Sequence, residues 1–195
     1  LSQRTGFLVE ALNFGFTHIS RHAEVIARQD ADDVSLPTRI KSQLQLLTSN
    51  DQIALVGASH LNIDINGSFQ RVVAALVDPR AIRARLRTGM PFAGPSIVAH
   101  RRLFDALGGY DTAFDGRLGE DYDLLVRAAE LVDMSAVEDP LYVYRTGNPA
   151  SMFGAVGYEY RGSKALVPQP PPLRQSVIFP NPRPPVPPLR SLLHK

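Results

Sequence analysis

The sequence predicts an α/β domain, and three observations support this fold class. Segments with apolar residues at helical spacing alternate with short β-prone runs. Two groups of acidic residues come at the boundaries between these elements. The 195 residues, of which 44% are hydrophobic, are enough for one domain with a substantial core.

The first predicted element is an amphipathic helix over residues 3–20, where apolar residues recur at helical spacing. No predicted strand precedes it. Helices in α/β sheets cross over between strands, so we expect a domain that lacks its first strands. A β-prone run over residues 24–29 follows, and it ends in an acidic cluster.

A second helix is expected soon after this cluster. Pro37 suits its first turn, and Ser35 or Leu36 stands near the cap position. The helix is expected to end near residues 49–51. Its predicted apolar face consists of Ile40, Leu44 and Leu47.

The middle of the chain combines β-prone runs with a basic helix. Residues 53–57 read as a buried strand. Asn66-Gly67, between β-prone residues 61–64 and 69–73, predicts a tight hairpin. The helix expected over residues 79–88 carries four arginines, which we interpret as a solvated face.

The last predicted elements are short. Residues 92–99 form a loop that leads into a strand, and Gly108-Gly109 ends a helix over residues 101–107. A further helix begins at the second acidic cluster, and closing strands are expected at residues 134–137 and 141–144. The apolar face of that helix is predicted to contain Leu124, Leu125, Ala128 and Leu131.

The net positive charge of the chain is concentrated in its C-terminal segment. Residues 167–195 contain ten of the 16 prolines and four basic residues but no acidic one. The other 17 of the 21 basic residues stand against 19 acidic ones in residues 1–166, a balance of −2. We therefore expect a domain over residues 1–166, a disordered proline-rich basic tail over 167–195, and no nucleic-acid partner.

Other features of the composition exclude several kinds of site. The sequence has no cysteine, which excludes disulfides, thiolate metal sites and cysteine nucleophiles. No apolar run approaches the roughly 20 residues of a membrane span, and no signal peptide is recognisable. The expected location is the cytoplasm.

Three carboxylates within four positions follow the first predicted strand, at Asp30, Asp32 and Asp33. In open α/β sheets, ligands gather at the carboxyl ends of strands. Neighbouring carboxylates repel one another, and a divalent cation such as Mg²⁺ or Mn²⁺ removes this repulsion and commonly carries a substrate's phosphates. The alternative interpretation is a solvated acidic turn with Ser35 as a helix cap.

Glu120, Asp121 and Asp123 form a second acidic cluster at the start of a predicted helix. Acids at that position also occur simply because they complement the helix dipole. The two clusters together suggest that one holds a metal on a diphosphate while the other takes a proton from an attacking hydroxyl. Four histidines form no recognisable ligand pattern and are expected at the surface: His22, His60, His100 and His194.

A series of motifs occurs in a fixed order. The first half of the chain contains Ala11-Leu12-Asn13, Ile26-Ala27-Arg28-Gln29-Asp30-Ala31-Asp32-Asp33, Leu36-Pro37-Thr38-Arg39 with Gln43, and Ala54-Leu55-Val56-Gly57. The second half contains Pro95-Ser96, Gly108-Gly109-Tyr110-Asp111, Gly119-Glu120-Asp121-Tyr122-Asp123-Leu124 and Tyr144-Arg145. This ordered set resembles family 2 glycosyltransferases of the GT-A fold over residues 1–150.

The resemblance implies inverting transfer of a sugar from a nucleotide-diphosphate sugar, with UDP or dTDP as the expected nucleotide. The acceptor would be a hydroxyl of a polysaccharide, a lipid-linked glycan or another glycan. The resemblance is also compatible with peripheral association of the protein with the cytoplasmic face of the membrane. Asp32 and Asp30 match the D-x-D motif. Asp32 would hold the divalent cation, Mn²⁺ or Mg²⁺, and Asp30 would lie near the donor's ribose and the metal. Arg28 is counted with the donor-binding residues.

The same resemblance implies roles for residues far downstream. Asp121 would be the general base, with Glu120 beside it. The segment Gly108, Gly109 and Tyr110 would form a wall between the donor sugar and the acceptor.

The chain also departs from the family pattern. The βαβ portion that binds the nucleotide base does not precede Leu1, so we expect weak donor binding and little activity from these 195 residues alone. Gly94 and Thr146 occupy positions where the family often has histidine. The Q-x-x-R-W signature of processive members is missing, which favours single transfers over polymerisation.

Two other interpretations remain at the level of sequence. Asp30-Ala31-Asp32-Asp33-Val34 also fits a haloacid-dehalogenase-like phosphatase, with Asp30 as nucleophile and Asp32 as acid/base. Residues 185–190 fit a PxxPxR ligand of SH3-type domains, so an inactive fragment that acts as an interaction module is a further alternative, although an SH3-type partner is not favoured. A Ca²⁺ loop of EF-hand type fails because Val34 stands where an oxygen ligand belongs.

Overall fold

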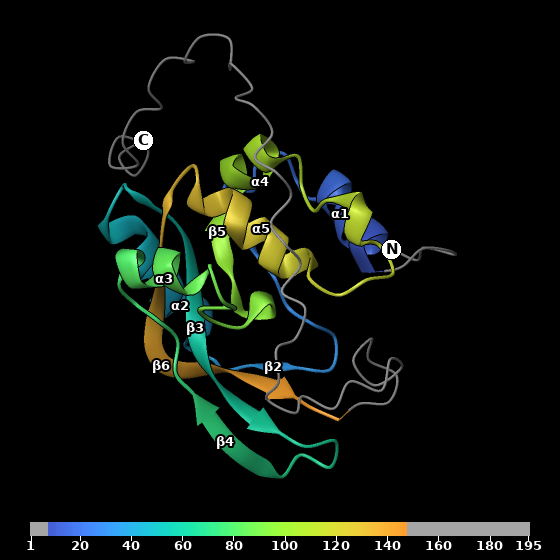
Figure 1. Cartoon of the computed structure of the whole chain (residues 1–195), viewed down its shortest axis with the longest axis vertical. Helices are drawn as coiled ribbons and strands as arrows, with labels where there is room; N and C mark the ends of the chain where they lie inside the picture. The colour runs from blue at the N-terminus through green and yellow to red at the C-terminus, as the bar shows by residue number, and fades with distance from the viewer. Residues whose placement is uncertain (1–7, 148–195) are drawn as a thin grey trace, which may run out of the picture.

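The computed structural model describes residues 8–147, which form a six-stranded sheet with helices on both faces (Figure 1). The helices are α1 (Leu8–His18), α2 (Arg39–Ser49), α3 (Pro79–Arg85), α4 (Arg101–Leu107) and α5 (Glu120–Ala129), with short 3-10 turns η1 (Gly94–Ser96) and η2 (Thr112–Phe114). The strands are β1 (Val25–Ala27), β2 (Val34–Ser35), β3 (Ile53–Ile63), β4 (Phe69–Val73), β5 (Val98–His100) and β6 (Asp133–Arg145).

The sheet is built around two long central strands. Its order is β1-β5-β3-β6-β2, and β4 pairs with the second half of β3. β3 and β6 run parallel, from the pair Ile53 and Asp133 to the pair Ile63 and Arg145, whereas every other strand pair among the described residues is antiparallel. This mixed sheet with helices between its strands agrees with the predicted α/β class.

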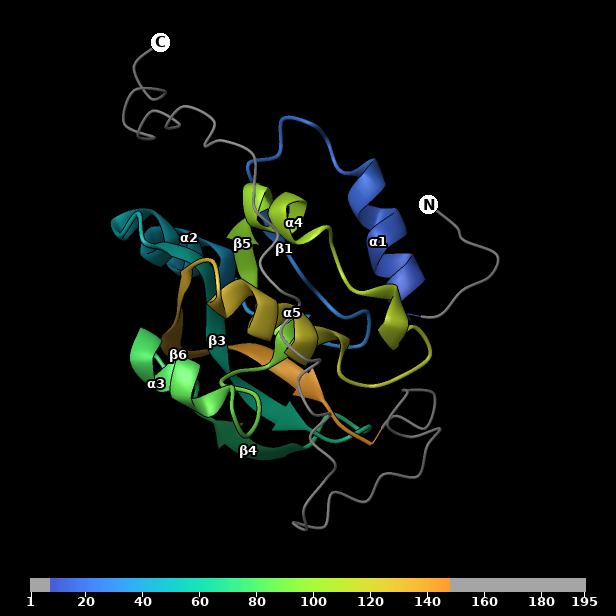
Figure 2. The ribbon, with the colours of Figure 1, turned by 45° about the horizontal axis from the view of Figure 1, so that its top comes forward.

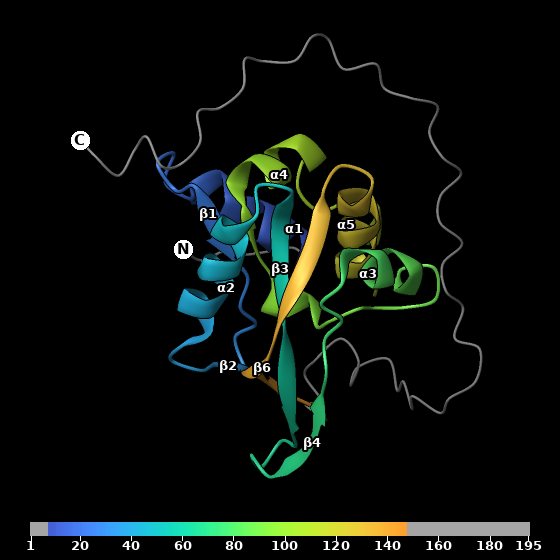
Figure 3. The same ribbon diagram turned by 90° about the vertical axis from the view of Figure 1, so that its left-hand side faces the viewer.

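Helices cover the two faces of the sheet unequally. Figure 3 shows the sheet nearly edge-on, with α2 on one side and α3 and α5 on the other. The larger hydrophobic core lies on the α3 and α5 side and includes Leu55, Ile82, Leu124, Leu125 and Met134. A smaller core lies under α2 and contains Leu47, Ile53, Val56 and Val98. Burial of these side chains is the main stabilising contribution to the domain.

Helices α1 and α4 lie near the β1 end of the sheet (Figure 2). The backbone amides of Val9 and Glu10 each donate to the Asp115 carboxylate at 3.1 Å, which satisfies two donors in the first turn of α1. Phe16 of α1 packs against the rings of Phe104 and Tyr110, with centroids 4.8 and 5.8 Å away. These contacts fix α1 beside the segment that follows α4.

Two turn predictions are confirmed. The chain reverses between β3 and β4 at Asn66-Gly67, where Gly67 has a φ of +88° and the Asp64 carboxylate accepts the amides of Asn66 and Ser68. Gly108 ends α4 in the left-handed conformation, with a φ of +71°. Glycine adopts this conformation without the Cβ strain that other residues incur.

The predicted start of the second helix is wrong, and its predicted apolar face is confirmed for Leu47 and Leu44 but not for Ile40. Helix α2 begins at Arg39, after Thr38, while Ser35 belongs to β2 and pairs with Tyr142. The side chains that α2 buries are those of Arg39, Gln43 and Leu47, and Ile40 is 39% exposed. Arg39 and Gln43 turn inward because they bond to backbone carbonyls in the interior, as described below.

Three further expectations differ from the structure. The two predicted closing strands are one strand, β6, whose register with β3 shifts near Pro140, a residue without an amide hydrogen for the ladder. The basic helix is not wholly solvated, since Arg83 donates to the carbonyl oxygens of Ala129 and Val132. His60 is buried in β3 rather than exposed.

The predicted tail over residues 167–195, its SH3-type motif and the start of the first helix at residues 3–7 lie outside the described residues. Among residues 8–147, no helix has the length and apolar character needed to cross a membrane.

Candidate active site at the end of β1

The first acidic cluster lies in the turn between β1 and β2, and its last carboxylate is held by β6. The Tyr142 hydroxyl donates to Asp33 Oδ2 at 2.7 Å, and the Arg145 amide donates to Asp33 Oδ1 at the same distance. The Tyr142 hydroxyl also accepts the Asp30 amide at 3.2 Å. Asp33 therefore anchors the turn, and Asp30 and Asp32 precede it on the same turn.

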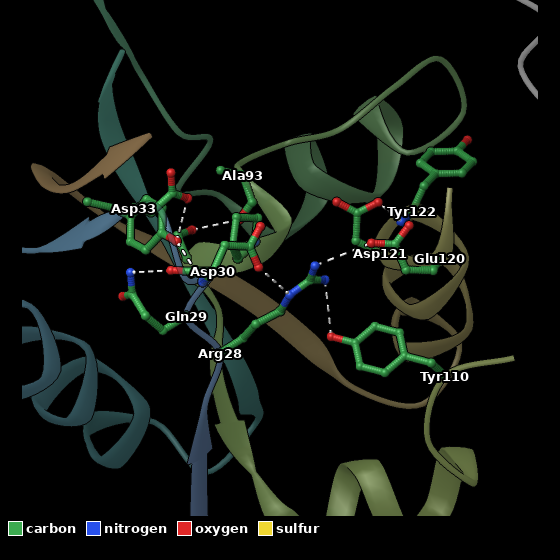
Figure 4. A network of polar contacts seen from close by, with 12 residues as sticks. Arg28, Gln29, Asp30, Asp33, Ala93, Tyr110, Glu120, Asp121 and Tyr122 are labelled. Carbon is green, nitrogen blue, oxygen red and sulfur yellow. Dashed lines mark hydrogen bonds and ion pairs between the residues drawn. The ribbon is translucent and has the colours of Figure 1, made fainter. Parts of the chain in front are cut away.

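Arg28 connects the two acidic clusters (Figure 4). Its Nε lies 3.4 Å from Asp30 Oδ1, and its Nη2 lies 3.3 Å from Glu120 Oε1 at the start of α5. Its Nη1 donates to the Tyr110 hydroxyl at 3.3 Å. Arg28 is only 7% exposed, so these contacts lie inside the protein, although its Nε makes the ion pair with Asp30 without a hydrogen bond. Arg28 and Glu120 are 92 positions apart in the sequence, so this contact joins distant segments of the chain.

Burial and neighbouring charges shift the pKa values of these groups. Burial would lower the pKa of Arg28, but the surrounding Tyr110 and acidic side chains raise it above its usual value. Burial raises the pKa of Asp30, and Arg28 only partly offsets this. Burial and then the adjacent Asp121 charge raise the pKa of Glu120. Asp121 also acts electrostatically on Asp30, so the structure brings the two predicted clusters into one site.

The glycine turn after α4 is fixed from two sides. The Asn13 side-chain amide donates to the Tyr110 carbonyl at 2.8 Å, and Asn13 Oδ1 accepts the Tyr110 amide at 2.9 Å. From α5, Arg127 donates to the carbonyl oxygens of Leu107 and Gly109 at 3.0 and 3.1 Å. These bonds hold the glycine turn in place, and Tyr110 at its end contacts Arg28. The wall role expected of Gly108, Gly109 and Tyr110 stays a prediction.

Asp121 lies between α5 and η1. Its Oδ1 accepts the Tyr122 amide at 2.8 Å, and its Oδ2 faces Gly94. Asp121 is half-buried, whereas Glu120 is 5% exposed and paired with Arg28. Of the two acids, Asp121 is the more exposed.

Two buried polar residues of α2, to which the sequence pattern assigned no role, support this site. Arg39 donates to the Arg28 carbonyl at 2.7 Å and stacks on Tyr142 with 4.7 Å between its guanidinium carbon and the ring centroid. Gln43 donates to the carbonyls of Val56 and Ser96 at 2.9 and 2.8 Å. Arg39 and Gln43 both belong to the ordered motifs that resemble the family. That resemblance was the only sign in the sequence that these two residues are important for the site. They hold the β1 end and η1 in fixed relative positions.

A separate open cleft of about 460 Å³ lies between α1, α4 and β1. Gly108 and Gly109 line it, together with Asn13 and Ile26. Neither acidic cluster contributes to its lining. Within residues 8–147, no group of three or more histidine or acidic side chains is arranged to hold a metal ion by itself.

The comparison with known families is decisive for the class of protein. A family model described as glycosyltransferase-like family 2 matches residues 3–167. The chain belongs to this family. The predicted resemblance is therefore confirmed, and the α/β domain is of the GT-A-like glycosyltransferase type.

This glycosyltransferase is also similar to curated proteins of polysaccharide synthesis. It is 30% identical over 164 residues to the O-antigen biosynthesis glycosyltransferase WbnJ of Escherichia coli. The matched residues cover 83% of the chain and 62% of WbnJ. It is 28% identical over 124 residues to the amylovoran biosynthesis glycosyltransferase AmsE of Erwinia amylovora, covering 64% of the chain and 44% of AmsE. The chain thus spans about half to three fifths of the length of these relatives.

The family match favours the glycosyltransferase interpretation over the phosphatase alternative for Asp30 and Asp32. The roles expected of Arg28, Asp30, Asp32, Glu120 and Asp121 remain predictions.

Proposed function

We propose that the protein transfers a sugar from a nucleotide-diphosphate sugar, with UDP or dTDP as its nucleotide, to a hydroxyl of a glycan acceptor with inversion at the anomeric carbon. The observation that carries this proposal is the contact of the buried Arg28 with Asp30 and Glu120, which brings the acidic turn next to the start of α5, where Asp121 lies. Such a transfer needs carboxylates that hold a metal ion on the donor's phosphates. It also needs a carboxylate that takes the proton of the acceptor hydroxyl.

Asp30 and Asp32 fit an open site for a divalent cation. Mg²⁺ is usually held by one or two carboxylates together with substrate phosphates and water, so a closed set of three protein ligands is not required. Tyr142 and Arg145 bind the Asp33 carboxylate and so anchor the turn. We assign the metal to Asp32 and Asp30 because these two acids match the D-x-D motif. A bound Mn²⁺ or Mg²⁺ would stabilise the negative charge that develops on the departing nucleoside diphosphate.

Asp121 is the candidate general base. An acceptor hydroxyl attacks more readily when a carboxylate within hydrogen-bond distance takes its proton during the reaction. Glu120 is less suited, because it is buried and paired with Arg28. Because Arg28 lies between Asp30 and Glu120, the donor phosphates would bind on the Asp30 side and the acceptor on the side of Asp121.

The proposal is tested by following the products of the full-length protein that carries these 195 residues. Proton NMR would monitor UDP- and dTDP-sugars with a glycan acceptor in Mn²⁺. We expect a product whose anomeric configuration is opposite to that of the donor, and loss of product formation with EDTA. Retention of configuration would contradict the proposal. An aspartyl-phosphate trapped on Asp30 would support the phosphatase alternative instead.

A further inference from the structure

Gly94 stands against the carboxylate that the proposed function uses as its base. A Cβ added to Gly94 would lie 2.2 Å from Asp121 Oδ2, 2.7 Å from its Cγ and 2.6 Å from its Cβ. Non-bonded carbon atoms pack at about 3.5–4.0 Å. Rotation of the carboxylate would not remove the overlap, because the Asp121 Cβ is attached to the backbone of α5.

The backbone of Gly94 does not itself require glycine. Its φ lies outside the left-handed region, unlike those of Gly108, Gly109 and Gly119. Any residue could adopt this conformation in η1. The requirement at position 94 is therefore for space, and Asp121 fills that space.

The segment that carries Gly94 is held against the sheet. The ring of Phe92 covers Gly57 of β3 so closely that a Cβ on Gly57 would lie 2.4 Å from it. The Ser96 hydroxyl donates to the Ala93 carbonyl at 2.7 Å and accepts the Ala58 amide at 3.2 Å. Gln43 also donates to the Ser96 carbonyl. Because of these contacts, any movement of η1 away from α5 would cost considerable free energy.

The other side of the contact is also fixed. Asp121 is in the first turn of α5, between Glu120, which pairs with Arg28, and Tyr122, whose hydroxyl donates to the Leu86 carbonyl. Later in α5, Arg127 joins the helix to the Gly109 carbonyl. Both elements that meet at Gly94 and Asp121 are thus tied to different parts of the fold.

We infer that Gly94 is a positioning residue, which by lacking a side chain sets where the Asp121 carboxylate lies relative to Arg28 and Asp30. This inference rests on the proposed function of Asp121 as the base. A larger residue at position 94 would displace the Asp121 carboxylate from the reacting hydroxyl. It would leave the turn between β1 and β2, and the contacts of that turn with the nucleotide-sugar donor, in place.

The test compares Gly94→Ala with Gly89→Ala in the full-length protein. A Cβ on Gly89 would come no closer than 4.0 Å to its nearest neighbour, Arg85 Nε, so this variant is a matched control. We expect Gly94→Ala to lower kcat by about 10- to 100-fold, since misplacement by about 1 Å costs up to about 10²-fold, with the KM for the donor unchanged. Gly89→Ala should keep the wild-type kcat. A wild-type kcat in Gly94→Ala would overturn the inference.

A double-mutant cycle separates this inference from the proposed function. If Gly94 acts through Asp121, Gly94→Ala should lower kcat in the wild type but not in an Asp121→Asn background. An equal loss in both backgrounds would refute the inference. A wild-type kcat in Asp121→Asn alone would refute the base assignment instead, whatever Gly94→Ala does.

A stability measurement covers the case in which Gly94→Ala folds poorly. The melting temperature should fall in Gly94→Ala, and this fall should be smaller in an Asp121→Gly background, which removes the atoms that overlap. An undiminished fall in that background would show that position 94 is limited by something other than Asp121, and would refute the inference.

Discussion

Arg28 at the end of β1 and Glu120 at the start of α5 form a buried ion pair, with 3.3 Å between Nη2 and Oε1. The pair joins the acidic turn after β1 to the helix that carries Asp121. Because the same guanidinium also contacts Asp30 and Tyr110, it fixes the relative positions of both acidic clusters.

Replacement of Arg28 should destabilise the fold strongly. Arg28→Met leaves the buried Glu120 carboxylate and the half-buried Asp30 carboxylate without their shared cation, and breaking a buried pair such as Arg28–Glu120 costs about 3–5 kcal/mol. Arg87→Met, at an exposed position, should change the free energy of unfolding by less than about 0.5 kcal/mol. Urea denaturation of both variants measures the difference. Equal stability of the two would show that Arg28 is not the central link.

The Tyr142 hydroxyl should be important for the order of the acidic turn. Tyr142→Phe removes the donor to Asp33 and the acceptor for the Asp30 amide, and unsatisfied buried groups cost about 1–3 kcal/mol each. The affinity for Mn²⁺ in the presence of a nucleoside diphosphate should fall as well, because Asp30 and Asp32 lie on that turn. Calorimetric titration tests this. A wild-type affinity in Tyr142→Phe would argue against a metal site at the turn.

Asn13 should stabilise the segment around Tyr110 through both of its side-chain groups. Asn13→Ala removes both bonds to the Tyr110 backbone, and each is worth about 0.5–1.5 kcal/mol. Asn13→Asp keeps the acceptor for the Tyr110 amide and loses only the donor. Thermal unfolding should therefore rank the wild type above Asn13→Asp and Asn13→Ala. The prediction fails if Asn13→Ala melts at the wild-type temperature.

Protonation of Glu120 should stabilise the fold as the pH falls. Burial and Asp121 raise the pKa of Glu120 in the folded protein, so the native state binds more protons than the unfolded chain above the usual carboxylate range of about 4. The stability that Glu120 contributes is complete below its unfolded pKa and is lost as the pH rises through the folded pKa.

The contribution of Glu120 is measured as a difference between proteins. Burial lowers the pKa values of His60 and His100, which makes the fold less stable as the pH falls through their titration range. Both histidines are present in wild type and Glu120→Gln, so their effects largely cancel in the comparison. The free energy of unfolding of Glu120→Gln minus that of the wild type should increase with pH above about 4. A constant difference would contradict the shifted pKa.

Some of the fold and site was predictable because short-range chemistry determines it. Asn66-Gly67 specifies a hairpin and Gly108 a helix end by their backbone preferences alone. The acidic motifs after β1 and at the start of α5 could be found because their residue types match a known pattern. That pattern also placed Tyr110 near the site, although no local rule links Tyr110 to Arg28.

Other features depend on contacts between distant segments. The periodicity of α2 favoured Ile40 for the core, but Arg39 and Gln43 are buried because interior carbonyls of Arg28, Val56 and Ser96 accept their hydrogen bonds. Apolar periodicity carries no information about such acceptors. The closeness of Gly94 to Asp121 likewise depends on how η1 packs against α5, which no spacing along the chain reveals.

The most direct test of the account is the turnover of Asp121→Asn in the full-length protein, measured beside Asp51→Asn at an exposed turn. Loss of a general base should lower kcat by about 10²–10⁴-fold, and calorimetry should show unchanged binding of the donor nucleotide. Asp51→Asn should keep the wild-type kcat. A kcat of Asp121→Asn within about twofold of wild type would contradict the assignment of Asp121 as the base.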